Sequence, residues 1–389
     1  QAAFPAVWSL LDASERSQLV ALAGDSITVK HPQLFLVMKA TRLCNLRCSY
    51  CNFWREGPNQ VMPVEMLEQA TREALSLPWV KQVDFVWHGG ETTLLPISFF
   101  KKAVELQLRF RGNRTVTNST QTNATLLHEG WIDLFKKNKF SVGVSIDPPP
   151  ERHSKYRRTK GGDDSWQASL AGLKQLKEAG IDHGVLIVVN SELVSYGAER
   201  FLSCLDEYDL TKVALLNVIP DNASPVPGSV DYLDWEQFVD FLIEIYRLWD
   251  NRYRGRLNIR ELESLAGNVK GRRPTSCVFA GNCMGQFLTV EPSGQVSACD
   301  KYVDEPSYVF GDLSRESLSA ILSGEKLSKV QRGYFRGQND LEKCQYYEYC
   351  NGGCPHDQHL QRTIHPGKTI HCCGLARLID VMRQGGTNA

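Results

Sequence analysis

The sequence has no long hydrophobic stretch and no excess of charge of either sign. No apolar run approaches the ~20 residues that a membrane-spanning helix needs. The 44 basic residues balance the 44 acidic ones, so composition gives no reason to expect nucleic acid or an anionic membrane as a partner. The basic start and apolar run of a secretory signal are missing, as are internal repeats and low-complexity tracts. These absences predict an ordinary globular protein without a membrane anchor.

Length and cysteine usage narrow the class further. The chain has 389 residues, of which 42% are hydrophobic and 23% charged, so it can form one large domain with an appendage or two modest domains. Its 12 cysteines are unevenly placed: three lie between positions 44 and 51, Cys204 stands alone, and the other eight lie between positions 277 and 373. This clustering favours metal binding over disulfides, and we expect a reducing, cytoplasmic location.

Buried strands and amphipathic helices alternate through the first half of the chain. Strands are expected at 34–38, 83–87, 115–122, 141–146, 184–189 and 213–218, and helices at 66–77, 98–110, 124–137, 166–179 and 198–208. Such alternation implies parallel strands with right-handed crossovers. The sequence therefore predicts an α/β fold, a partial (β/α)6 TIM-like barrel with catalytic loops at the carboxyl ends of its strands.

The remaining segments suggest five parts. We expect an N-terminal helical extension at 1–33 with an amphipathic segment at 8–22, and the barrel at 34–218. A linker and bridging helix follow at 219–275, with the helix itself at 235–250. A cysteine-rich domain is expected at 276–375, and a C-terminal helix and tail at 376–389.

Cys44, Cys48 and Cys51 follow the first expected strand with the spacing C-x3-C-x2-C. Three thiolates on one loop can hold three irons of a [4Fe–4S] cluster and leave the fourth iron open. A zinc knuckle that borrows a distant fourth ligand is the alternative. The motif resembles the radical SAM superfamily, in which the open iron chelates S-adenosylmethionine and an electron cleaves that cofactor to a 5′-deoxyadenosyl radical. The resemblance implies that this radical abstracts hydrogen from an unactivated carbon.

The same resemblance implies a cofactor site on the barrel. Gly89, Gly90 and Glu91 would bind the amino group of the methionine part, and Tyr50 would lie near the adenine. Ser145 would contact the ribose or methionine part, and Arg157 or Arg158 the carboxylate. Asn123 follows the third strand where the family has Thr-Asn-Gly, with Ala124 in place of the glycine, and Leu186 would pack on the adenine. A plain glycine turn and ordinary core packing are the alternatives.

The C-terminal cysteines resemble the SPASM domain, an appendage of radical SAM enzymes that often act on peptides. The resemblance implies one auxiliary [4Fe–4S] cluster held by Cys277, Cys283, Cys299 and Cys354. A second would take Cys344, Cys350 and one of Cys372 and Cys373, which makes three clusters in all. Leu341 stands where the central block has its first cysteine, so the fourth ligand is open between the other cysteine of the pair, Asp340 and none. Zinc remains the alternative for this region.

Asp300 directly follows Cys299. The Cys-Asp pair resembles anaerobic sulfatase-maturating enzymes, in which the aspartate is a general base near the substrate. After hydrogen abstraction the product still has to lose a proton, and a carboxylate can take it. An aspartate that only accepts hydrogen bonds in a turn is the alternative.

Three functions follow from these resemblances. The run at 87–96 resembles peptide maturases, so we expect an enzyme that crosslinks a ribosomally made precursor peptide, through a carbon–carbon cyclophane or a thioether bond. The alternative is a sulfatase maturase that oxidises cysteine or serine to formylglycine, and the third is a non-enzymatic iron–sulfur scaffold. The expected partners are the precursor peptide and an electron donor such as flavodoxin or ferredoxin. Residues 1–31 are too few for the leader-binding domain of such maturases, so a leader is expected to bind elsewhere.

Overall fold

The computed structural model describes Glu15 and residues 29–218, 233–281, 283–302, 304–341, 343–365 and 372–385, without the side chains at 339, 340 and 385. The expected helix at 8–22, apart from Glu15, and the linker segment at 219–232 lie outside the described residues. In the described part of the chain, no helix is long and apolar enough to cross a membrane.

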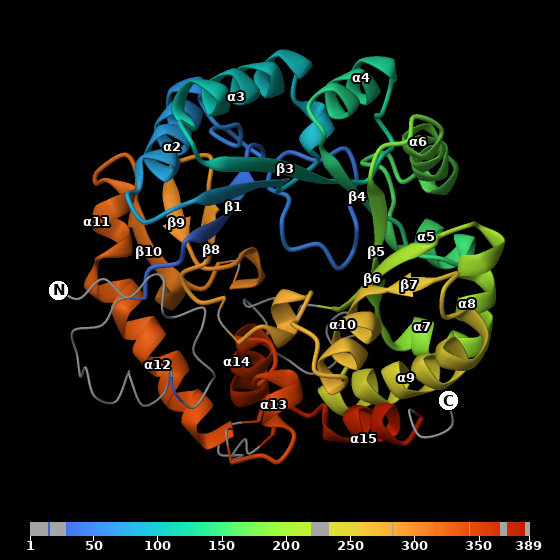
Figure 1. Cartoon of the computed structure of the whole chain (residues 1–389). Helices are drawn as coiled ribbons and strands as arrows, with labels where there is room; N and C mark the ends of the chain where they lie inside the picture. Colours follow the sequence, from blue (N-terminus) through green and yellow to red (C-terminus); the bar gives the residue numbers. More distant parts are fainter. Residues whose placement is uncertain are drawn as a thin grey trace.

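The six expected strands are present and parallel, in chain order. They are β1 (Gln33–Lys39), β2 (Gln82–His88), β3 (Thr115–Thr122), β4 (Ser141–Ser145), β5 (His183–Val189) and β6 (Lys212–Asn217). The sheet extends beyond them on both sides. β7 (Asn258–Ile259) pairs with β6, and β8 (Phe287–Val290) pairs with β1, both in parallel. The antiparallel strands β9 (Gln295–Ser297) and β10 (Val309–Asp312) complete the order β10-β9-β8-β1-β2-β3-β4-β5-β6-β7, which confirms an open, partial barrel (Figure 1).

Helices cover the outer face of this curved sheet. They are α2 (Val64–Ser76), α3 (Ile97–Phe110), α4 (Glu129–Lys137), α6 (Trp166–Glu178) and α8 (Ala198–Glu207), and they surround the strands in Figure 1. Trp87 on β2 shows why the layers pack. Its ring is fully buried, lies 5.2 Å from the ring of Phe100 on α3, and donates from Nε1 to Asn118. Burial of large aromatic rings between sheet and helices is the main stabilising contribution here.

Three helices that precede the cysteine-rich region were not evident from the sequence. α5 (Pro150–Tyr156) begins at the last of three consecutive prolines, because proline fits the first helical position. α7 (Ser191–Tyr196) is capped by Asn190, whose side chain accepts from Leu193. α10 (Arg260–Val269) falls in a segment that reads as polar linker, but one of its faces, including Leu262, is buried.

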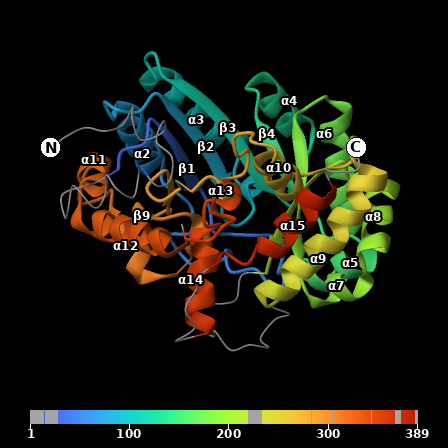
Figure 2. The same cartoon turned by 60° about the horizontal axis from the view of Figure 1, so that its bottom comes forward.

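The cysteine-rich region joins the barrel directly through β8. Its helices are α11 (Leu318–Leu322), α12 (Glu325–Leu341), α13 (Tyr347–Cys350) and α14 (Pro355–Ile364). The expected bridging helix is α9 (Trp235–Leu248), and the expected C-terminal helix is α15 (Ala376–Gly385). Short turns of helix lie at η2 (Thr92–Leu94), η3 (Trp249–Tyr253), η4 (Cys277–Phe279), η5 (Asp300–Tyr302) and η6 (Pro306–Tyr308). Figures 1 and 2 both show α12, α13 and α14 on the side of the sheet away from α3 and α4. This region therefore lies against the barrel rather than apart from it.

The inner face of the sheet carries polar residues near the carboxyl ends of its strands. Lys39 ends β1, His88 ends β2, Gln121 is the next-to-last residue of β3 and Ser145 ends β4. Side chains alternate between the two faces of a strand, so the neighbours of these residues fill the outer core while they face inward. The fold thus gathers polar groups at the edge where barrel enzymes hold their active sites.

Candidate active site

The loop between β1 and α2, residues 40–62 and here called the cysteine loop, is fixed by the turn after β2. The N–H groups of Gly90 and Glu91 donate to the carbonyl oxygens of Thr41 and Leu43, both at 2.8 Å. A Cβ atom on Gly90 would lie 1.9 Å from the carbonyl oxygen of Leu43, so only glycine permits this approach. The Gly-Gly turn therefore positions the cysteine loop, and its contact with a cofactor stays a prediction.

The carboxylate of Glu91 is 1% exposed and accepts four hydrogen bonds from the protein. Its Oε1 accepts from the amide of Thr93 at 3.0 Å, the hydroxyl of Thr93 at 2.5 Å and the hydroxyl of Thr122 at 2.6 Å. Its Oε2 accepts from the amide of Asn123 at 2.7 Å. A carboxylate offers about four acceptor positions, so these contacts favour a structural role for Glu91. The expected direct contact with a cofactor ammonium stays a prediction.

Asn123 ties the end of β3 to the cysteine loop. Its Nδ2 donates to Oδ1 of Asn45 at 2.9 Å, and its Oδ1 accepts from the amide of Thr125 at 3.0 Å. Ala124 has φ +61°, a left-handed conformation that glycine adopts more easily than alanine, which agrees with the glycine of the Thr-Asn-Gly pattern that this stretch resembles. The same backbone turn delays α4, which begins at Glu129 rather than at 124.

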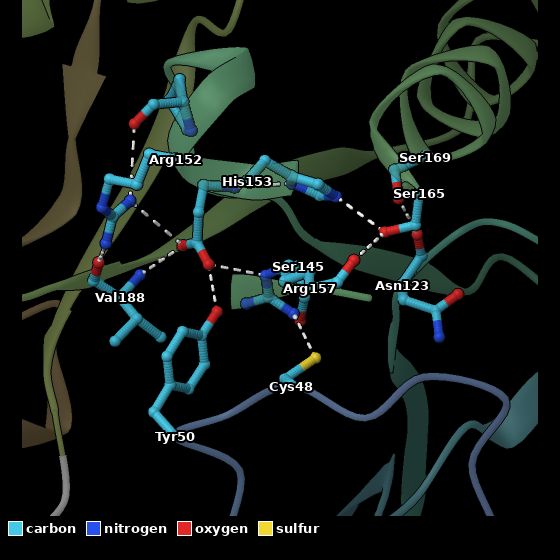
Figure 3. A network of polar contacts seen from close by, with 12 residues as sticks. Cys48, Tyr50, Asn123, Ser145, Arg152, His153, Arg157, Ser165, Ser169 and Val188 are labelled. Atoms are coloured by element: carbon cyan, nitrogen blue, oxygen red, sulfur yellow. Dashed lines mark hydrogen bonds and ion pairs between the residues drawn. The ribbon is translucent and has the colours of Figure 1, made fainter. Parts of the chain in front are cut away.

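Asp147, which follows β4, is fully buried beside the cysteine loop. Figure 3 shows its partners Tyr50, Arg152 and Arg157 pointing toward one another. Its Oδ2 accepts from the hydroxyl of Tyr50 and from Nε of Arg157 at 2.6 Å. Its Oδ1 accepts from the amide of Val188 at 2.9 Å and lies 3.7 Å from Nη1 of Arg152. Burial alone would raise the pKa of Asp147, but the two guanidinium groups lower it to about 2. The ionised carboxylate therefore orients Tyr50 and Arg157 together.

The structure distinguishes the two candidate arginines. Nη1 of Arg157 lies 3.9 Å from Sγ of Cys48, and the residue is 6% exposed. Arg158 is exposed and donates to the carbonyl oxygen of Gly162 at 3.0 Å. Arg157, with its guanidinium 5.4 Å from the ring centre of Tyr50, is the arginine beside the cysteine loop.

Ser145 and Leu186 are neighbours across the sheet. They are paired in register on β4 and β5, and both are half-buried. Nε2 of Gln121 donates to Oγ of Ser145 at 2.8 Å. Gln121 was not expected at the site, although its place near the end of a buried strand is a signal that points to it.

The three thiols of the cysteine loop suit an iron–sulfur cluster. Burial raises the pKa of Cys48 to about 12. The positive charge of Arg157 lowers this pKa, whereas the charges of Cys51 and Cys44 raise it further. Burial likewise raises the pKa of Cys44 to about 12, and the charge of Cys51 contributes. The thiols are thus close enough to repel one another as thiolates. The positive charge of bound iron would offset that repulsion, and thiolates are ligands that iron prefers.

A second group of four cysteines gathers in the C-terminal region, namely Cys277, Cys283, Cys299 and Cys354. Burial raises the pKa of Cys283, and the charges of Cys354 and Cys277 raise it further. Burial is the largest cause that raises the pKa of Cys299, and the charges of Asp300, Cys277 and Cys354 raise it further. The thiols of these four residues therefore lie near enough to influence one another's charge. That they bind one auxiliary cluster stays a prediction.

The third group contains both adjacent cysteines. Sγ of Cys373 lies 3.2 Å from Sγ of Cys350. Cys344 and Cys372 are hydrogen-bonded to each other and so are Cys372 and Cys373. Two thiols from the loop before α15 thus meet two from the segment around α13, so four sulfurs are present without a cysteine at 341.

Leu341 itself is 1% exposed and packs in the core at the end of α12. The side chain of Asp340 lies outside the described residues. The geometry therefore favours Cys372 and Cys373 together over an open position in the second auxiliary cluster, and this assignment stays a prediction.

Asp300 reaches from the cysteine-rich region to the inner face of the barrel. Its Oδ2 lies 2.6 Å from Nδ1 of His88 and 3.1 Å from Nζ of Lys39. Burial would raise the pKa of Asp300, but Lys39 and His88 hold it well below its usual value. Phe53 of the cysteine loop covers Lys39, with 4.3 Å between Nζ and the ring centre. The carboxylate is therefore held ionised at the carboxyl ends of β1 and β2.

Lys39 and His88 were not among the expected site residues. Both end strands that read as buried core, and their partner lies more than 200 positions away. A charged residue that ends an apolar strand, directly before the cysteine loop, is the signal that could have found Lys39.

Comparison with known proteins agrees with this arrangement. The profile of the radical SAM superfamily matches residues 38–192, and that of an iron–sulfur cluster-binding domain, SPASM, matches residues 277–355. A serine-type anaerobic sulfatase-maturating enzyme of Bacteroides thetaiotaomicron is 31% identical over 366 residues, which cover 88% of this chain and 87% of that protein. A cysteine-type enzyme of Clostridium perfringens is 28% identical over 333 residues, covering 83% and 89%.

Solved structures extend the likeness to three dimensions. The structure described as native anSMEcpe with bound AdoMet and Cp18Cys peptide superposes with a TM-score of 0.78 and 25% identity, covering 92% of this chain and 97% of that one. The likeness therefore spans the barrel and the cysteine-rich region together. This chain belongs to the SPASM-containing radical SAM family of the anaerobic sulfatase-maturating enzymes, and it is a radical S-adenosylmethionine enzyme that acts on a peptide or protein substrate.

Proposed function

We propose that this enzyme oxidises a cysteine or serine side chain of a protein substrate to formylglycine. The observation that carries the proposal is the position of Asp300, whose carboxylate is held by Lys39 and His88 at the carboxyl ends of the barrel strands. The likeness to serine-type and cysteine-type maturases over most of the chain supports it.

The proposed reaction requires the protein to supply a base. With its clusters and S-adenosylmethionine bound, such an enzyme can remove a hydrogen atom from an unactivated carbon. Conversion of serine to the aldehyde removes two protons and two electrons in all. Cysteine loses the same number to give a thioaldehyde, which water then converts to the aldehyde with release of hydrogen sulfide. Once one hydrogen atom has left, a base must take the remaining proton, and an auxiliary iron–sulfur cluster would accept the remaining electron. Asp300 suits the base, because Lys39 and His88 keep it ionised in a site that is mostly closed to water.

A crosslinking reaction is the second candidate. It is favoured by one observation: His88, in the run at 87–96 that resembles peptide maturases, is in direct contact with Asp300. Ring closure onto an aromatic carbon also ends with loss of a proton, so the same carboxylate would serve. The two candidates differ in whether the product contains a new side-chain aldehyde.

One experiment separates them. The protein is reconstituted without oxygen and given S-adenosylmethionine, a reductant and peptides with a cysteine or serine target. Formylglycine predicts a product that reacts with a hydrazine reagent, with sulfur lost from the cysteine peptide. A crosslink predicts a loss of two hydrogens, no reaction with hydrazine, and a ring that resists fragmentation. Deoxyadenosine without any change in either peptide would contradict the formylglycine proposal.

A further inference from the structure

Lys301 directly follows the proposed base and lies beside the cysteines of the C-terminal region. It is the middle residue of η5, and its side chain is 19% exposed. Its Nζ lies 3.8 Å from Sγ of Cys354 and donates to Oδ1 of Asp357 at 3.0 Å. Asp300 contacts the barrel, whereas Lys301 contacts the start of α14. One turn of helix therefore holds both the proposed base and a cation beside a predicted cluster ligand.

Lys301 acts on all four predicted ligands of one auxiliary cluster, here called the Cys354 cluster. Burial is the largest cause that raises the pKa of three of these thiols, and the positive charge of Lys301 opposes it at each of them, namely Cys277, Cys283 and Cys354. The backbone N–H of Lys301 donates to the sulfur of Cys299. The side chain and the backbone of one residue thus face a single set of thiols.

The donor set of four thiols fits a [4Fe–4S] cluster, because such clusters are held by cysteine thiolates. All four cysteines lie within residues 277–355, which match the iron–sulfur cluster-binding domain. A cluster that accepts an electron becomes more negative, so a cation close to its sulfur ligands stabilises the reduced form. Net charge and hydrogen bonds at the sulfurs are therefore means by which a protein raises the reduction potential of a cluster.

We infer that Lys301 raises the reduction potential of the Cys354 cluster, so that this cluster accepts the electron that leaves the substrate when Asp300 takes the proton. The inference deepens the proposed function and rests on it, because formylglycine formation releases that electron. Asp357 limits the effect, since its negative charge acts on Cys354 in the opposite direction. Two consecutive residues of η5 then serve the two parts of one oxidation, the proton and the electron.

The test measures the reduction potentials of the clusters in the full-length reconstituted protein, by titration with a reductant followed by paramagnetic resonance. Lys301→Met keeps most of the length of the side chain and removes its charge. We expect one potential to fall, so that reduction of that cluster becomes about tenfold less favourable, which is about 59 mV for one electron. Lys301→Arg keeps the charge and should keep the potential of the wild type.

Asp357→Asn tests the same inference with the opposite sign. Loss of this carboxylate leaves the positive charge of Lys301 unopposed beside Cys354, so the same potential should rise. Residues that only support the fold would not shift one potential in opposite directions. This variant decides the inference by itself if the Lys301→Met protein binds less iron than the wild type.

Lys329→Met is the matched control. Lys329 is an exposed lysine on α12 of the same region and contacts no cysteine in the described part of the chain, so its loss should leave every potential unchanged. Unchanged potentials in Lys301→Met and Asp357→Asn, or shifts in the same direction, would overturn the inference while the proposed function stands. The proposed function fails separately, if the wild type converts neither a cysteine nor a serine peptide to an aldehyde.

Discussion

Nζ of Lys39 lies 3.1 Å from Oδ2 of Asp300, although the two residues are 261 positions apart in the chain. Lys39 ends the first barrel strand and is 1% exposed, whereas Asp300 belongs to the cysteine-rich region. The ion pair therefore requires both regions to be packed together. It makes the position of the proposed base a property of the whole fold rather than of one domain.

Replacing Lys39 should destabilise the protein. Lys39→Met leaves a largely buried carboxylate with His88 alone, and breaking a buried ion pair costs about 3–5 kcal/mol. Urea denaturation of the reconstituted protein measures the change in the free energy of unfolding. Lys212→Met removes an exposed lysine paired with Asp182 and should cost no more than about 1 kcal/mol. Equal losses for the two variants would contradict a structural ion pair at Lys39.

Asp147→Asn should lower the free energy of unfolding by an amount that depends on pH. The folded protein lowers the pKa of Asp147 from 3.8 to about 2, so the ionised carboxylate stabilises the fold at every pH above its unfolded value. We expect the variant to be about 3–5 kcal/mol less stable near neutral pH, because Arg157 and Arg152 lose their counter-ion. The difference from the wild type should shrink as the pH falls from about 4 to about 2. Chemical denaturation across this range measures it, and a difference that stays constant down to the lowest pH would contradict the role of Asp147.

Much of the fold could be predicted from the sequence, because buried strands and amphipathic helices alternate with clear periods. The boundaries of β3 and α3 were predicted to within a residue. The prediction failed where composition hides a local pattern. Proline at the first position of α5 looks like a break, and the charged residues of α10 mask its buried face.

The sequence likewise predicted some residues of the candidate site and not others. Residues in local motifs, such as Cys48 and Gly90, could be identified because their spacing carries the information. Lys39 and His88 could not, since their roles depend on contacts with Asp300 that only the packed barrel creates. The same holds for Asp147, which was not among the expected site residues and is the partner of Tyr50 and Arg157.

Cys372→Ala and Cys373→Ala test the second auxiliary cluster. If both adjacent cysteines bind iron, each variant should lose iron and acid-labile sulfide equivalent to one [4Fe–4S] cluster, or show a changed paramagnetic resonance signal for it. Cys204→Ala is the control, since this buried cysteine stands alone on α8 and should leave the iron content unchanged. Loss in only one of the two variants would show that the other cysteine is not a ligand.

Gly90→Ala should displace the cysteine loop. The added Cβ would lie 1.9 Å from the carbonyl oxygen of Leu43, so the loop must move and the first cluster should be lost together with deoxyadenosine formation. Iron analysis and chromatography of the products measure both. Gly162→Ala is the comparison, because a Cβ there meets nothing within 4 Å, although its φ of +92° adds backbone strain of about 1 kcal/mol. A Gly90→Ala protein with full iron content and activity would contradict the proposed role of this glycine.

Asp300→Asn tests the central claim most directly. Reconstituted wild type, Asp300→Asn and the surface control Asp182→Asn are each incubated with S-adenosylmethionine, reductant and a cysteine- or serine-containing peptide, and deoxyadenosine and aldehyde are measured in the same samples. The account predicts that Asp300→Asn forms deoxyadenosine at close to the wild-type rate, while aldehyde falls by about 10²–10⁴-fold because the base is lost. Aldehyde formation at the wild-type rate by Asp300→Asn would contradict it.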